Sequence, residues 1–70
     1  MSDISSIVEA IEYASASTTG KEHQFIEYVK NYINTRDPYY AKKAQKTYKS
    51  LGYSSQARMD QFYNAIANLY

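Results

Sequence analysis

The chain has 70 residues, no cysteine and a formal net charge of +1. This length allows one domain with a thin core, because a chain of about 60 residues buries only about 60% of its unfolded surface. Disulfide bonds and thiolate metal sites are excluded, and no apolar run approaches the roughly 18 residues of a membrane span. The first residues lack the basic region of a secretory signal. We therefore expect a single helical domain over residues 1–70 in the cytoplasm, or the host cell cytoplasm for a viral protein.

Two segments in the first half have the apolar spacing of amphipathic helices. The first runs from Asp3 to Ala16, with Ser2 or Asp3 as its cap. Its apolar face comprises Ile4, Ile7, Val8 and Ile11. The second runs from Gly20 to Thr35, where Thr19 and Glu22 have the spacing of a capping box. Its apolar face comprises Phe25, Ile26, Val29, Tyr32 and Ile33.

A third helix is predicted from Pro38 to Ser50, because proline suits the first helical position and Asp37 can cap it. Its inward face comprises Tyr40, Ala44, Tyr48 (or Thr47) and Leu51. Gly52 is the expected left-handed residue that ends this helix, with Tyr53 placed to touch the last turn.

The fourth helix begins after Ser54 or Ser55 and runs toward the C-terminus. Its core positions are Met59, Phe62, Tyr63, Ile66 and Leu69. No segment alternates with a period of two for long enough to form a strand. Short connections favour antiparallel neighbours, so the sequence predicts an all-α fold, a compact three- or four-helix bundle.

Catalytic chemistry has little support in this sequence. The only histidine, His23, is expected to be exposed in a helical first turn, with no cysteine or second histidine to form a metal site or a nucleophile–base pair. The two glycines are far apart, which excludes a phosphate-binding loop. We expect neither enzymatic activity nor a cofactor or metal.

The charge is unevenly distributed along the chain. Residues 1–35 have a net charge of −3 and residues 36–70 a net charge of +4. Much of the positive charge lies on the outward side of the third helix, which two tyrosines flank. The predicted partner-binding residues are Tyr39, Lys42, Lys43, Lys46, Lys49 and Tyr53.

Nine tyrosines are many for so thin a core, because each buried hydroxyl needs a partner. Those predicted outside or at the edge of the apolar faces are Tyr13, Tyr28, Tyr39, Tyr53 and Tyr70. Tyrosine is enriched at protein interfaces. The leading hypothesis is therefore a non-enzymatic regulator or inhibitor that binds an acidic patch on another protein. Small size and lack of catalytic groups would suit a product of a phage or mobile element.

An alternative is a helix-turn-helix transcriptional regulator that binds duplex DNA with residues 38–70. In that hypothesis the lysines neutralise phosphates and the fourth helix reads bases. The reading residues would be Ser55, Gln56, Arg58, Gln61 and Asn64. Tyr48 departs from this motif, which normally has a small residue four positions before the turn glycine.

Residues 52–66 contain Gly-Tyr-Ser-Ser followed by Gln-Ala-Arg. This stretch resembles the start of the second helix in ribbon-helix-helix repressors, where Arg-Ser-Glu follows the serines. The resemblance implies DNA binding and assigns no role to an individual residue. The sequence shows no N-terminal strand of the kind found in that family.

Two further hypotheses remain open. The chain could be a small structural or assembly subunit, which the sequence does not exclude. The acidic first half and basic second half could also pair between copies, and a homodimer would supplement the thin core.

Overall fold

The computed structural model describes residues 4–69, which form four α-helices in chain order. These are α1 (Ile4–Ser17), α2 (Gly20–Thr35), α3 (Pro38–Ser50) and α4 (Tyr53–Leu69). No strand occurs within these residues, and the predicted all-α bundle is confirmed. The predicted caps of α1, Ser2 and Asp3, and the C-terminal Tyr70 lie outside the described residues.

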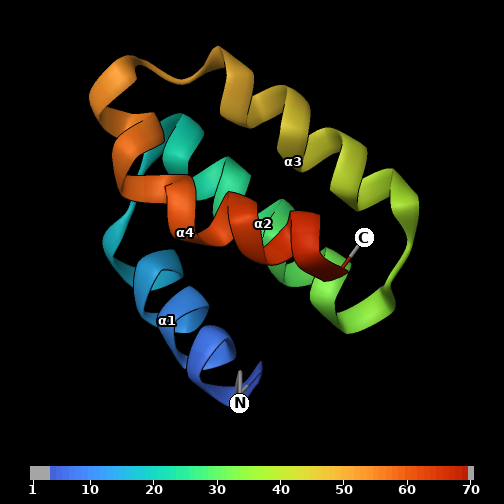
Figure 1. Cartoon of the computed structure of the whole chain (residues 1–70). Coiled ribbons are helices and arrows are strands. Elements are labelled where there is room, and N and C mark those ends of the chain that lie inside the picture. Colours follow the sequence, from blue (N-terminus) through green and yellow to red (C-terminus); the bar gives the residue numbers. More distant parts are fainter. Residues whose placement is uncertain (1–3, 70) are drawn as a thin grey trace.

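Helix α2 is the central element of the bundle (Figure 1). It packs against α1, α3 and α4, and α4 also packs against α3. Helix α1 meets α4 only over a short stretch, and within residues 4–69 it makes no contact with α3. The first and third helices therefore lie on different sides of α2.

The hydrophobic core follows the predicted apolar faces closely. Phe25, Ile26 and Val29 on α2 are completely buried, and the core positions predicted on α4 from 59 to 66 are buried or partly buried. Ala14 and Ala41 are buried as well, although neither was among the predicted core positions. Small residues at these positions let the neighbouring helices approach closely. The side chains of Ile4 and Leu69 lie outside the described residues.

The two ends of α2 use backbone conformations rather than the predicted capping box. Thr19 occupies the N-cap position, but its side chain makes no capping hydrogen bond. The capping-box prediction is wrong because the Glu22 carboxylate instead accepts hydrogen bonds from α4. At the other end, Arg36 adopts a left-handed conformation with φ 59°, and its N–H donates to the Tyr32 carbonyl at 2.6 Å.

The beginning of α3 is as predicted. The Asp37 carboxylate accepts a hydrogen bond from the Tyr39 N–H at 3.0 Å, and Pro38 occupies the first helical position. This cap satisfies a backbone donor that the helix itself leaves unpaired.

The turn between α3 and α4 differs from the prediction. Leu51 is extended, with φ −73° and ψ 152°, and its side chain is buried. Gly52 is not left-handed, because burial of Leu51 already redirects the chain. The Gly52 carbonyl accepts from the Gln56 N–H at 2.9 Å, which closes the first turn of α4 and starts it at Tyr53, before the predicted serines. Tyr53 is 91% exposed and does not pack on the last turn of α3.

Candidate functional site

The outward side of α3 carries five of the six residues that the sequence predicted for partner binding. Lys42, Lys46 and Lys49 recur at intervals of four and three residues, so they share one helix face. All three are exposed, and Lys43 beside them is half-buried. We call Tyr39, Lys42, Lys43, Lys46 and Lys49 the lysine face; at 1.5 Å per residue the 13-residue helix is about 20 Å long.

Tyr39 is held in position at the start of this face. Its ring is 55% exposed and makes an edge-to-face contact with Tyr40, with centroids 5.3 Å apart and planes at 78°. The Lys43 Nζ lies 5.5 Å from the Tyr39 ring centroid, within the range of a cation–π contact. Together these contacts present Tyr39 as an ordered aromatic surface.

The predicted second tyrosine, Tyr53, lies beyond the other end of α3. It is the first residue of α4 and is almost fully exposed. The structure therefore places one exposed tyrosine before and one after the four lysines, as the sequence predicted. No hydrogen bond or ring contact of the Tyr53 side chain occurs within the described residues.

An aromatic stack fixes the inner side of α3 to its neighbours. Tyr48 stacks on Tyr63 of α4, with centroids 4.1 Å apart and planes at 14°, and contacts Phe25 of α2 at 5.8 Å. The Tyr48 hydroxyl donates to the Asp60 carboxylate at 3.1 Å. Partial burial raises the pKa of Tyr48, and the hydrogen bond to Asp60 raises it further. These contacts tie the helix that carries the lysines to both α2 and α4.

The lysine face has no compensating carboxylates. In the part of the chain that the structure describes, the only ion pair joins Arg58 to Glu22, and neither lies on α3. Asp37 is at the start of α3, where its carboxylate caps the backbone. Four lysines on one helix that form no ion pair with a described residue produce a positive potential over that face.

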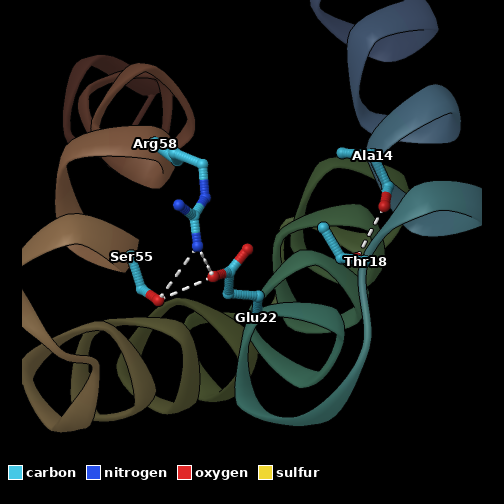
Figure 2. A network of polar contacts seen from close by, with 5 residues as sticks. All are labelled: Ala14, Thr18, Glu22, Ser55 and Arg58. Carbon is cyan, nitrogen blue, oxygen red and sulfur yellow. Dashed lines mark hydrogen bonds and ion pairs between the residues drawn. The ribbon is translucent and has the colours of Figure 1, made fainter.

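The helix-turn-helix residues are not arranged as one free reading face. Ser55 and Arg58 both donate to the Glu22 carboxylate on α2 (Figure 2), and the Gln56 Nε2 donates to the Tyr48 carbonyl at 3.0 Å. Gln61 and Asn64 are exposed. At about 100° per residue, Gln56 lies about 140° around α4 from Gln61. The Asn64 Nδ2 donates to the Asp60 carboxylate at 3.5 Å, so four of the five predicted side chains make intramolecular contacts.

The Glu22 contacts connect the beginnings of α2 and α4. The Ser55 hydroxyl donates to the Glu22 carboxylate at 2.6 Å, and the Arg58 guanidinium forms an ion pair with the same oxygen. The hydrogen bond from Arg58, followed by that from Ser55, holds the pKa of Glu22 below its usual value. In the same region, the Thr18 hydroxyl donates to the Ala14 carbonyl at 2.6 Å at the end of α1 (Figure 2).

An open groove lies between α1 and α4 and was not predicted from the sequence. Tyr13 of α1, 78% exposed, and Gln61 of α4 stand beside it, and the Glu22–Arg58 pair also borders it. Its apolar lining comprises Ala10, Ala14, Met59 and Phe62. Single-helix periodicity could not predict this groove, because it depends on how little α1 and α4 touch.

His23 is less exposed than predicted. It is half-buried in the first turn of α2, and its Nδ1 is buried without a hydrogen-bond partner in the described residues. Packing of this turn against its neighbours, which helical periodicity did not indicate, covers the ring. Residues 4–69 contain no cluster of three or more His, Cys, Asp or Glu side chains that could hold a metal ion.

The described helices include none with the length and apolar character needed to cross a membrane. Comparison with family models, curated proteins and solved structures gives no match to this chain.

Proposed function

We propose that this chain is a non-enzymatic regulator that binds an acidic surface of another protein through the lysine face and Tyr53. The observation that carries the proposal is the set of four α3 lysines between two exposed tyrosines: three are exposed, one is half-buried and none forms an ion pair within the described residues. Positive charge that is not tied up in ion pairs speeds association with a negatively charged surface. Exposed tyrosines add contact area at low entropic cost.

The preformed geometry of α3 favours this function. The Asp37 cap and the Tyr48 stack hold the helix, so binding requires little ordering of the backbone. Tyr39 is already oriented by Tyr40 and Lys43. The main entropic cost of binding is then the ordering of the lysine side chains.

Protein binding has better support than duplex DNA reading. A DNA reader of the helix-turn-helix type needs free polar side chains on one side of α4. Ser55, Gln56 and Arg58 instead bond to the protein itself. The lysine face is on α3, and its aromatic neighbours suit an acidic protein surface.

A photo-crosslinking experiment tests this proposal. Replacing Tyr39 by p-benzoylphenylalanine keeps an aromatic ring at the site and captures the bound protein in cells of the source organism. Affinity for the captured and purified partner is then measured with the unmodified chain and a Lys42→Ala/Lys46→Ala/Lys49→Ala variant. At about 0.5–1 kcal/mol per exposed ion pair, we expect the variant to bind roughly 10- to 100-fold more weakly.

The matched control removes three positive charges elsewhere. A Lys21→Ala/Lys30→Ala/Arg36→Ala variant loses the same charge from α2 and its cap, and we expect a change of less than about threefold. Equal losses in both variants would reduce the effect to net charge and contradict the site assignment.

A labelled mixed-sequence DNA duplex provides the second arm. We expect no binding at about 50 mM salt. Binding that weakens steeply between about 50 and 200 mM salt, as for proteins that neutralise several phosphates, would instead identify the lysine face as a DNA-binding surface.

A further inference from the structure

Helix α1 presents an acidic surface opposite in sign to the lysine face. Glu9, Glu12 and Tyr13 are all exposed, and Tyr13 is 78% exposed. At about 100° per residue the three side chains span about 100° of the helix circumference. We call these three residues the acidic face.

The acidic face and the lysine face cannot meet within one molecule. Helix α1 packs on α2 and marginally on α4, and it has no contact with α3 in the described residues. Figure 1 shows α1 and α3 on different sides of the bundle. The two faces therefore cannot neutralise each other within a single copy and are available to a second copy.

We propose that the acidic face of one copy docks on the lysine face of another. This inference rests on the proposed function, because both use the lysine face, and it names a second copy of this chain as one of its partners. Self-association would then compete with binding of an acidic partner.

The two faces match in charge and spacing. Glu9 and Glu12 are three residues apart, as are Lys46 and Lys49, so each pair is separated by about 4.5 Å along its helix. Two helices packed side by side can thus form two ion pairs at once. Tyr13 adjoins the glutamates and supplies apolar contact area to the interface.

The contact joins two different surfaces, so it is heterologous rather than two-fold symmetric. After the first contact one copy still has its lysine face free and the other its acidic face, so association can continue along a row. Exposed ion pairs are individually weak and are screened by salt. We therefore expect self-association at high protein concentration and low salt.

Sedimentation equilibrium tests the proposal with the full chain. Between about 10 µM and 1 mM protein, we expect the mean mass to rise with concentration at about 50 mM salt and to stay monomeric at about 500 mM salt. A monomer at about 1 mM protein in the low salt overturns the proposal.

Charge reversal identifies the two faces. Glu9→Lys/Glu12→Lys and Lys46→Glu/Lys49→Glu should each abolish self-association. Combining all four changes exchanges the signs, keeps the wild-type net charge and should restore self-association. Loss in the single-face variants without restoration in the combined variant overturns the pairing, as does persistence of self-association in either single-face variant.

A second control and a second readout complete the design. Lys21→Glu/Arg36→Glu reverses two charges outside both faces and should leave self-association intact. Circular dichroism of every variant checks that its helical fold is retained. Glu9→Lys/Glu12→Lys retains the lysine face, so its affinity for the captured acidic partner should not fall. If the wild-type chain binds the captured partner but does not self-associate, this inference alone is overturned. Loss of partner binding on removing the α3 lysines tests the proposed function separately.

Discussion

Glu22 is the residue through which the beginnings of α2 and α4 hold one another. Its side chain is 17% exposed, and its carboxylate accepts hydrogen bonds from both Ser55 and Arg58. Replacing it by glutamine removes the ion pair and weakens both hydrogen bonds. We expect Glu22→Gln to lower the free energy of unfolding by about 1 kcal/mol at pH 7, measured by urea denaturation.

The pH dependence of this loss follows from the lowered pKa of Glu22. A carboxyl group with a lower pKa in the folded than in the unfolded state stabilises the fold above its unfolded value, near 4.5. That contribution disappears as pH falls through the folded pKa. The stability difference between wild type and Glu22→Gln should thus shrink below pH 4.5. Glu9→Gln, at an exposed position, is the control; a constant difference for Glu22→Gln down to pH 2 would contradict this account.

The role of a residue whose partner lies far away in the sequence could not be predicted from the sequence alone. Thr19 and Glu22 have the spacing of a capping box, yet Glu22 contacts Arg58, which is 36 positions away. The competition between a local cap and a tertiary ion pair is decided by where α4 packs. The positions of Lys42, Lys46 and Lys49 on one face, by contrast, follow from helical periodicity alone.

Close packing of α3 on α2 depends on alanine at the element scale. Ala41 and Ala44 are completely buried on α3, where a larger side chain has no space unless the helices separate. We expect Ala44→Leu to reduce the free energy of unfolding by about 1–3 kcal/mol, the usual cost of overpacking a core. Ala57→Leu, at an exposed position of α4, is the matched control and should change stability by less than about 0.5 kcal/mol. If Ala44→Leu and Ala57→Leu change the free energy of unfolding equally in urea denaturation, α3 can move away from α2 without loss of stability.

Helix bounds were predictable where the chain carries strong local signals. The Asp37-Pro38 pair placed the start of α3 correctly, because its cap and fixed φ act within one turn. The prediction of a left-handed Gly52 is wrong, since the extended Leu51 makes the turn and α4 begins at Tyr53. The groove between α1 and α4 is likewise a product of packing, which no single helix encodes.

The whole molecule is organised around α2, and the local stability of each segment should decrease with its distance from that helix. Three of the largest fully buried side chains, Phe25, Ile26 and Val29, lie on α2, which contacts every other helix. Among the described residues, α1 buries only Ile11 and Ala14 and touches α4 narrowly. A sequence shows which helices are amphipathic, but periodicity does not reveal which of them becomes central.

This asymmetry predicts that α1 opens before the rest of the bundle. Amide hydrogen exchange followed by NMR should show the slowest exchange in α2 and the fastest in α1, because regions with few buried apolar contacts open at lower free energy. Ile11→Ala should accelerate exchange mainly in α1, whereas Phe25→Ala should accelerate it in all four helices and cost about 3–5 kcal/mol. Exchange in α1 as slow as in α2 would mean that the bundle opens as one unit. Detachment of α1 would carry the acidic face away from the bundle, so the same measurement on Ile11→Ala, combined with sedimentation, shows whether self-association requires α1 to be docked.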